Sequence, residues 1–321
     1  MNYKEVQEKI LGDIMPAVPV PLLEDGSIHL ESQENYVKWM NKQPVNTVAI
    51  WAHTGRGLNL SKEQRKVVFN QWRNGLDEEK MILCGVGANI RDGIKDEEYI
   101  QEAVNMAKEA KELGANLIMP YAPTLFRGRE NQDEMILKYH NEIAKLGLPM
   151  VLFFLYEDAG GITYSLDVLK ELFKIPNVIA IKMATLDSVM TYQDVSNMIK
   201  EEDTDVALIT GEDRMFGYTV MRGAKGALIG LSSIYTKLQK DMITSYYKGN
   251  YEEFIRKSEV VDNLAEHTFY SPMEGYIERI LYILGEKGII SKDATNDPFG
   301  PGVDQWERER IDRFIEELGE M

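Results

Sequence analysis

The sequence predicts an α/β fold in which a (β/α)8 barrel carries a C-terminal helical extension. Short apolar runs alternate with longer amphipathic stretches, the runs number eight, and the chain has 321 residues. An open, doubly wound sheet would satisfy the same alternation, but eight strands at this length favour the closed barrel. No glycine-rich phosphate loop follows the first run, which weakens the prediction of a nucleotide-binding open sheet.

The strand candidates are short and apolar, which is typical of strands that are covered on both faces. They are Ile14–Pro21, Thr47–Ala52, Met81–Val86, Leu117–Pro120, Pro149–Leu155, Val178–Lys182, Val206–Thr210 and Ala227–Leu231. Strands that alternate with helices in this way are expected to pair in parallel through right-handed crossovers.

The helix candidates between these strands have clear boundary signals. They are Leu30–Lys42, Lys62–Leu76, Asp96–Leu113, Gln132–Leu146, Ser165–Phe173, Ser188–Lys200 and Asp213–Arg222. Ser61 and Gln64 fit a capping box at the start of the second helix. Gly75, Gly114 and Gly147 each follow a last apolar position and are expected to end helices.

The alternation stops after Leu231, and only helix candidates follow. These are Thr236–Tyr247, Tyr251–Leu264, Pro272–Leu284 and Asp304–Leu318. The sequence therefore predicts a barrel over residues 1–234 that carries the functional site, and a helical extension over residues 235–321 that packs on the barrel.

Composition excludes several classes of partner. The chain has 36 Lys and Arg against 52 Asp and Glu, a net charge of −16 that would repel nucleic acid. No apolar run approaches the roughly 20 residues that cross a bilayer, and the polar start does not fit a secretory leader. A single cysteine, Cys84, and histidines without metal-ligand spacing predict no disulfide and no metal site. We expect a soluble cytoplasmic protein that contacts no membrane.

Lys182 is the strongest candidate for chemistry, because it ends an otherwise apolar strand. A buried amine loses basicity, and a neutral lysine can attack a carbonyl to form a Schiff base. The alternative is a lysine whose stem is buried while its amine reaches solvent at the end of the strand.

Six segments in a fixed order carry a family resemblance between about residues 12 and 234. They are Ile14–Pro21 with Asp25-Gly26, Thr54-Gly55, Gly85–Asn89, Gly114–Asn116 with Pro120-Tyr121, Val178–Thr185, and Gly211–Asp213. The chain resembles the dihydrodipicolinate synthase and N-acetylneuraminate lyase family of class I, Schiff-base aldolases.

The resemblance implies a barrel with a C-terminal helical bundle that assembles as a homo-oligomer, a dimer or more usually a tetramer. It implies that Lys182 forms an imine with pyruvate or another 2-oxo acid, without a metal or organic cofactor. It places Tyr121, Gly211 and Leu228 in the substrate site, with Leu228 near the pyruvyl methyl group. Leu228 alternatively belongs only to the barrel core.

The chain departs from the family on the fifth strand, where a tyrosine usually relays protons. Depending on the register, Phe153 or Phe154 occupies that position, and phenylalanine cannot transfer a proton. Both rings are expected to exclude water and to favour the neutral amine. Tyr156 either brings a hydroxyl from the following loop or only covers the site.

The turn after the second strand also departs from the family pattern. Thr54 and Gly55 are expected to hold the substrate carboxylate with backbone amides. His53 replaces a threonine of the family's proton relay, and we expect it to act as the acid–base group. It alternatively fills space or binds substrate only. Arg56 replaces a glutamate and is either a clamp for a substrate carboxylate or a salt-bridge residue.

Two further positions concern the second substrate, the aldehyde with which the 2-oxo acid would react. Ala122 replaces a tyrosine, and Asp158 or Ala159, depending on the register, replaces an arginine that would bind a carboxylate. 4-Hydroxy-tetrahydrodipicolinate synthase activity is therefore not expected. After the seventh strand, the carboxylates of Glu212 and Asp213 could bind a polar substrate, but we expect Asp213 to cap the following helix.

The sequence thus predicts a Schiff-base lyase or aldolase that acts on a small 2-oxo acid and makes or breaks a carbon–carbon bond. Two alternatives remain open at this point. One is a barrel that binds a 2-oxo acid or sugar acid without turnover. The other is a Schiff-base dehydratase or decarboxylase of a sugar-derived acid.

Overall fold

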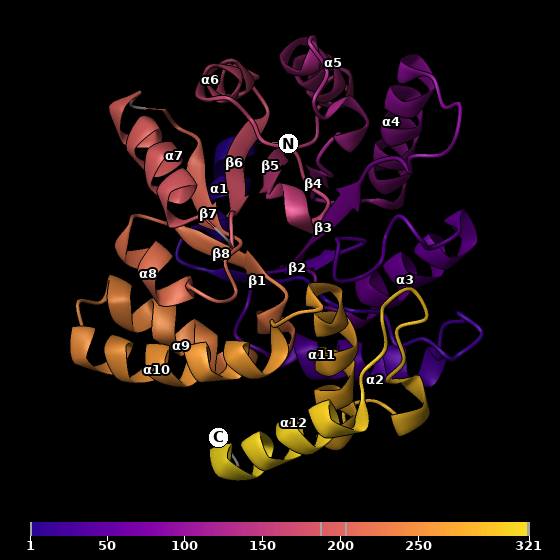
Figure 1. The fold of residues 1–321 in the computed structure, drawn as a ribbon, viewed down its shortest axis with the longest axis vertical. Helices are drawn as coiled ribbons and strands as arrows, with labels where there is room; N and C mark the ends of the chain where they lie inside the picture. Colours follow the sequence, from indigo (N-terminus) through magenta and orange to yellow (C-terminus); the bar gives the residue numbers. More distant parts are fainter. Residues whose placement is uncertain (1, 187, 203, 320–321) are drawn as a thin grey trace.

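Eight parallel strands form a closed barrel in the computed structural model, which describes residues 2–186, 188–202 and 204–319, apart from the side chain of Asp158. The strands are β1 (Ile14–Pro16), β2 (Thr47–Ile50), β3 (Met81–Val86), β4 (Leu117–Pro120), β5 (Met150–Leu155), β6 (Val178–Ala184), β7 (Ala207–Thr210) and β8 (Gly226–Ile229). Their order is β1-β8-β7-β6-β5-β4-β3-β2, and a parallel bridge between Ala17 and Ala49 joins the two ends. The expected barrel is confirmed (Figure 1).

The first strand is shorter than the sequence predicts. β1 ends at Pro16 because the chain beyond Ala17 leaves the parallel ladder, and Leu22 pairs with Ile28 in an antiparallel bridge. Apolar composition alone could not distinguish these buried loop residues from a strand.

Side chains of each strand alternate between two apolar layers, because successive residues of a strand point to opposite faces. On β5, Val151 and Phe153 join a cluster inside the barrel, whereas Leu152 and Phe154 join the layer between the strands and the helices. The interior cluster is therefore a packed core, and only residues at its carboxyl end can face an open site.

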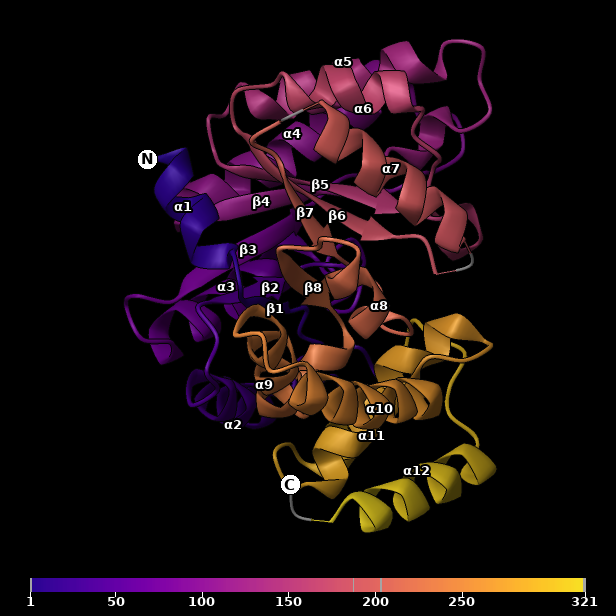
Figure 2. The same cartoon turned by 90° about the vertical axis from the view of Figure 1, so that its left-hand side faces the viewer.

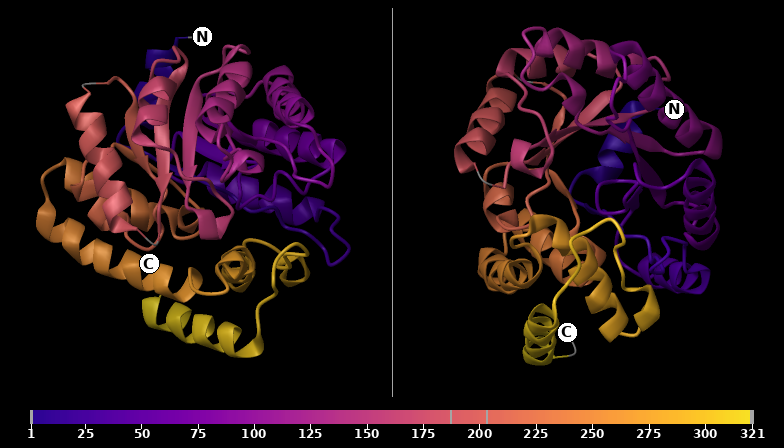
Figure 3. Two further views of the ribbon diagram at one scale, coloured as in Figure 1. Left: turned by 45° about the horizontal axis from the view of Figure 1, so that its top comes forward. Right: turned by 45° about the vertical axis from the view of Figure 1, so that its right-hand side comes forward.

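Eight helices surround the strands (Figure 3). They are α2 (Leu30–Asn41), α3 (Lys62–Gly75), α4 (Asp96–Leu113), α5 (Gln132–Ala144), α6 (Leu166–Phe173), α7 (Val189–Glu201), α8 (Phe216–Met221) and α9 (Thr236–Tyr247). α9 lies against β1, and its Lys240 pairs with Asp13 at 2.6 Å. Because α9 completes the ring, the extension starts after Tyr247 rather than at residue 235.

The capping predictions are confirmed in part. Ser61 and Gln64 form the expected capping box, and Gly114 caps α4 with a φ of 99°. Gly75 does not end α3 as a left-handed cap but is its last helical residue. A Cβ at Gly75 would lie 2.5 Å from Val37 Cγ1, so this glycine permits close packing of α3 on α2.

The helix α1 (Tyr3–Ile10) was not expected from the sequence. Its Val6 and Ile10 join the interior cluster, and Gln7 donates a hydrogen bond to the carbonyl of Ile179 at 2.7 Å. α1 thus covers the amino-terminal end of the barrel, which leaves the opposite end for the site.

The extension is helical and lies on one side of the barrel (Figure 2). It comprises α10 (Tyr251–Thr268), α11 (Tyr276–Glu286) and α12 (Gln305–Leu318), with the short 3-10 turns η4 (Met273–Gly275) and η5 (Lys292–Ala294). Further 3-10 turns follow β4, β5 and β8, namely η1 (Thr124–Phe126), η2 (Glu157–Ala159) and η3 (Leu231–Ser233). The buried Arg279 joins α11 to α12 through Glu307, at 2.7 Å.

None of the helices in the described residues is long and apolar enough to cross a membrane. In the same residues, no group of three or more His, Cys, Asp and Glu is placed to hold a metal ion. Cys84 is a buried free cysteine.

Candidate active site

Lys182 lies inside the barrel, near the carboxyl end of β6. The register of β5 and β6 sets it beside Phe153, and both side chains face inward. Lys182 is 7% exposed, so it is buried and does not reach solvent as the alternative interpretation required. Its Nζ lies 4.4 Å from the centre of the Phe153 ring.

A small cavity lies at this amine, with a volume of about 50 Å³. The ends of six strands contribute Ala17, Ala52, Phe153, Lys182, Gly211 and Gly230 to its wall. The C-terminal extension contributes Phe269, Met273, Glu274 and Tyr276. The site is therefore not confined to the barrel segment, contrary to the expected division of the chain.

Burial lowers the pKa of Lys182 to about 8, although the charges of Asp213 and Glu212 oppose this shift. Desolvation disfavours the ammonium form, and Asp213 and Glu212 act on it through their charge without a hydrogen bond to Nζ. A useful fraction of the amine is therefore neutral near physiological pH.

The absence of a side chain at Gly211 leaves space for the side chain of Lys182. A Cβ at this position would lie 2.6 Å from Cε of Lys182 and 2.9 Å from the carbonyl oxygen of Met183. Because the backbone cannot yield, any larger residue must displace the lysine.

We expect Gly211→Ala to slow imine formation by about 100-fold, since misplacing a reacting group by about 1 Å has an effect of this size. The rate of reductive trapping with a 2-oxo acid measures it. Circular dichroism of the same variant checks that the barrel is folded, and a folded variant with an unchanged rate would contradict the prediction.

The two carboxylates after β7 have different surroundings. Glu212 accepts hydrogen bonds from the backbone amide and hydroxyl of Thr185, and from the amide of Leu186 at 2.9 Å. It therefore fixes the end of β6. Asp213 lines the cavity and accepts a hydrogen bond from the amide of Leu231 at 2.8 Å. Burial raises the pKa of each carboxyl to about 7.

The expectation that Asp213 caps a helix is wrong. α8 begins only at Phe216, and the carboxylate of Asp213 instead bonds the segment that follows β8. The bond holds this segment at the cavity, to which Gly230 also contributes.

The turn after β2 presents two backbone amides and one hydroxyl. The amide of Gly55 donates to the carbonyl of Ala52 at 3.0 Å, which makes His53 and Thr54 the central residues of a tight turn. The central amides of such a turn take no part in its closing hydrogen bond. The hydroxyl of Thr54 lies 2.9 Å from that of Tyr276.

Arg56 joins this turn to the C-terminal extension. Its guanidinium donates to both carboxylate oxygens of Asp297, the shortest bond being 2.6 Å, and to Glu274 at 2.6 Å. Glu274 also contacts Nε2 of His53 at 2.7 Å. Burial raises the pKa of Glu274, but the hydrogen bonds and charges of His53 and Arg56 outweigh it and lower the pKa to about 2. We call these four residues the mouth clamp.

The comparison with known proteins agrees with this architecture. The model of the dihydrodipicolinate synthetase family matches residues 10–318. The chain belongs to the dihydrodipicolinate synthetase family.

Relatives and solved structures lie at low identity. An uncharacterized DapA-like lyase of Pyrococcus horikoshii is 26% identical over 290 residues, which cover 90% of this chain and 94% of the relative. A dihydrodipicolinate synthase from Oceanobacillus iheyensis has a TM-score of 0.83 at 18% identity and covers 99% of both chains. A sialic acid aldolase of Ruminococcus gnavus has a TM-score of 0.79 at 19% identity, covering 95% of this chain and 96% of its own.

Membership in the dihydrodipicolinate synthetase family confirms the resemblance and the barrel. It also confirms that the chain is an enzyme, a class I lyase or aldolase, and the low identity makes it a divergent member. Neither alternative is favoured, that is, neither a barrel that only binds its ligand nor a Schiff-base dehydratase or decarboxylase of a sugar-derived acid.

Only some of the predicted site residues lie at the cavity. The pairing of β5 with β6 places Phe153, and not Phe154, beside Lys182. Phe154 points outward and packs on Tyr164. The expectation that Phe154 shields the amine is therefore wrong, because alternate residues of a strand cannot share a face. Leu228 lies fully buried in the interior cluster and is not among the residues that line the cavity.

The turn predictions have different outcomes. Arg56 is the salt-bridge residue of the second interpretation, since its guanidinium is occupied by Asp297 and Glu274. The amide of Gly55 is likewise occupied, by Ala52. Tyr156 packs against the interior cluster, and the described lining residues of the cavity do not include it. The acid–base role of His53 stays a prediction.

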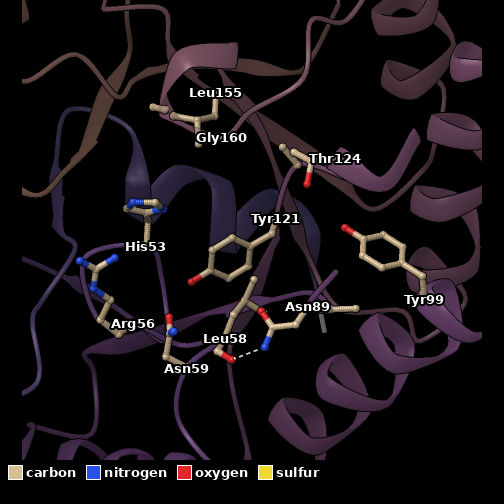
Figure 4. A pocket seen from close by; sticks show the side chains of 13 residues that line it. His53, Arg56, Leu58, Asn59, Asn89, Tyr99, Tyr121, Thr124, Leu155 and Gly160 are labelled. Atoms are coloured by element: carbon tan, nitrogen blue, oxygen red, sulfur yellow. Dashed lines mark hydrogen bonds between the residues drawn. The ribbon is translucent and has the colours of Figure 1, made fainter. Parts of the chain in front are cut away.

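A wider pocket of about 200 Å³ opens beside the cavity and shares His53, Leu155 and Ala159 with it (Figure 4). Tyr121 lines this pocket, and its hydroxyl donates to the carbonyl of Trp51 at 2.7 Å. Polar groups also come from Asn59, Asn89 and Thr124. The side chain of Asp158, a candidate at the missing arginine position, lies outside the described residues.

Tyr276, Glu274 and Asp297 are the site residues that the sequence did not indicate. They follow the Thr54 turn by more than two hundred residues. Glu274 and Tyr276 lie in the helix candidate Pro272–Leu284, and Asp297 precedes Pro298, but neither feature indicates where the extension docks.

Proposed function

We propose that this enzyme binds a 2-oxo acid as an imine on Lys182 and makes or cleaves a carbon–carbon bond beside that imine. The observation that carries the proposal is the lysine itself: a buried amine, without an ion pair among the described residues, at a cavity at the carboxyl end of the barrel. Sites of barrel enzymes lie at this end.

The chemistry follows from the neutral amine. Nζ of Lys182 attacks the ketone carbon, the electrons of the C=O double bond move to oxygen, and that oxygen leaves as water. The protonated imine then accepts the electron pair released when a bond to the neighbouring carbon breaks. The turn amides of His53 and Thr54 support binding of the substrate carboxylate, because aimed backbone donors favour an anion. Phe153 excludes water from the amine.

The second partner is proposed to be a small uncharged aldehyde that carries hydroxyl groups. The wider pocket offers amide and hydroxyl groups from Asn59, Asn89 and Thr124. Its arginine, Arg56, is neutralised by Glu274 and Asp297, so no free guanidinium in the described lining awaits a second carboxylate.

Borohydride trapping tests the function. The protein is incubated with pyruvate or a longer 2-oxo acid, reduced with borohydride, digested, and analysed by mass spectrometry. We expect the reduced adduct on the peptide that contains Lys182. Absence of an adduct with every 2-oxo acid tested would refute imine chemistry.

The rate of imine formation is expected to rise with pH through about 8 and then to level off. Only the neutral amine attacks, and burial lowers the pKa of Lys182 to about 8 from an ordinary 10.5. Trapping rates at low 2-oxo acid concentration between pH 6 and 11 measure the profile. A rate that still rises above pH 10 would show that the amine is not desolvated.

We further propose that the enzyme is a cytoplasmic homo-oligomer that needs no metal or organic cofactor. The buried free thiol of Cys84 fits a reducing compartment. The exposed side chains of Met190, Met221 and Ile255 offer apolar surface that association would cover. Sedimentation analysis tests the assembly, and activity after chelator treatment tests the metal.

A further inference from the structure

We propose that the paired hydroxyls of Thr54 and Tyr276 carry protons between the nitrogen of Lys182 and the departing substrate oxygen. Tyr276 comes from the C-terminal extension, so the extension supplies part of the reaction machinery. This inference rests on the proposed imine function and names a further catalytic pair for it.

The two hydroxyls lie 2.9 Å apart and line the cavity that contains Lys182. Gly230 lets them meet: a Cβ there would lie 3.0 Å from the ring of Tyr276 and 3.1 Å from Oγ1 of Thr54. The Tyr276 ring stacks on Phe269 with 4.5 Å between the ring centres. The tyrosine is thus held between fixed neighbours.

Imine formation requires such a carrier. An ammonium group and a ketone become a protonated imine and water, so two protons leave the nitrogen and both end on the oxygen. One proton reaches the oxygen when the amine adds, and the other when water departs. A hydroxyl that gives its proton to oxygen and takes one from nitrogen completes each transfer without a net change in charge.

Two other candidate proton carriers, Tyr121 and His53, have their polar atoms engaged elsewhere. Among the described residues lining the cavity, only Thr54 and Tyr276 carry hydroxyls. Tyr121 lines the wider pocket and donates a hydrogen bond to the carbonyl oxygen of Trp51. Nε2 of His53 is engaged by Glu274. Burial raises the pKa of Tyr276 well above its ordinary value, despite the opposing bond to Thr54, so the phenol stays protonated and can donate.

The variant Tyr276→Phe tests the inference, because it removes the hydroxyl and keeps the ring. We expect the maximal rate of adduct formation with pyruvate to fall about 100-fold, the lower end of the effect of a proton-transfer group. The pyruvate concentration at half-maximal rate should change less than about threefold. Exchange of the pyruvate methyl hydrogens with deuterated solvent should slow in parallel, since it requires the same imine.

Tyr36→Phe is the matched control. Tyr36 is also a buried tyrosine, but its hydroxyl bonds the carbonyl of Ser233 at 3.0 Å and does not line the cavity. The variant Tyr36→Phe should leave the maximal rate of adduct formation unchanged. Thr54→Val removes the partner hydroxyl at similar volume and should also lower the maximal rate. It keeps the inference testable if Tyr276→Phe does not fold.

The outcomes separate this inference from the proposed function. If the unaltered enzyme forms no adduct with any 2-oxo acid, imine chemistry itself fails. If it forms the adduct and folded Tyr276→Phe reacts at the same maximal rate, the hydroxyl pair is not the carrier. A variant that only weakens pyruvate binding would show that Tyr276 shapes the cavity without moving protons, which also overturns the inference.

Discussion

Lys182→Met is expected to abolish adduct formation and to lower turnover by roughly 10⁶-fold, the size of effect seen when a covalent nucleophile is removed. The methionine side chain fills similar space in the wall of the cavity but has no amine. Asp213 and Glu212 interact with Lys182 through their charge without a hydrogen bond to its amine, so the substitution breaks no such bond. The variant should therefore fold as well as the unaltered enzyme.

Reductive trapping and steady-state turnover measure this result. Lys108→Met is the control, because Lys108 is an exposed lysine on α4 that pairs with the exposed Glu112 at 3.9 Å. It should trap pyruvate at the normal rate. An adduct that persists on Lys182→Met would place the imine on another lysine and would contradict the assignment of the site.

Arg56→Met is expected to destabilise the protein by about 3–5 kcal/mol, the cost of removing one partner of a buried ion pair. Asp297 is 5% exposed and would lose its bidentate partner, while Glu274 would keep only His53. The mouth clamp joins the barrel turn to the extension that carries Tyr276. We therefore expect the rate of imine formation to fall as well.

The free energy of unfolding in urea measures the first effect, and reductive trapping measures the second. Arg91→Met is the matched control: Arg91 bonds Glu98 and Glu102, but its side chain is 47% exposed. Exposed pairs contribute at most about 1 kcal/mol. Equal destabilisation by both substitutions would show that burial of the mouth clamp has no energetic consequence.

Much of the fold could be predicted from local patterns. The eight strands follow from short apolar runs, and α4 and α9 have the bounds that the sequence indicates. Amphipathic periodicity and caps are properties of neighbouring residues, so they can be read along the chain. α1 was missed because its short apolar stripe, Val6 and Ile10, has meaning only against the end of a closed barrel.

Part of the site could be predicted in the same way. Lys182 stands out because a cation in a buried strand is costly unless it is neutral or paired. The residue that faces it could not be chosen, since Phe153 and Phe154 are equivalent until the register of β5 and β6 is known. Asp213 resembled a helix cap, and only the position of Leu231 shows otherwise.

The sequence by itself indicated the barrel and the buried lysine, because each depends on residue type and local order, and the family resemblance indicated the loss of a tyrosine on the fifth strand. Only the tertiary structure decided which side chains meet across the chain. In the folded chain, Arg56 pairs with Glu274 and Asp297. The hydroxyl of Tyr276 lies within hydrogen-bond distance of the hydroxyl of Thr54. Such contacts depend on how the extension docks, and docking is set by complementary shape and charge over the whole surface rather than by any single segment.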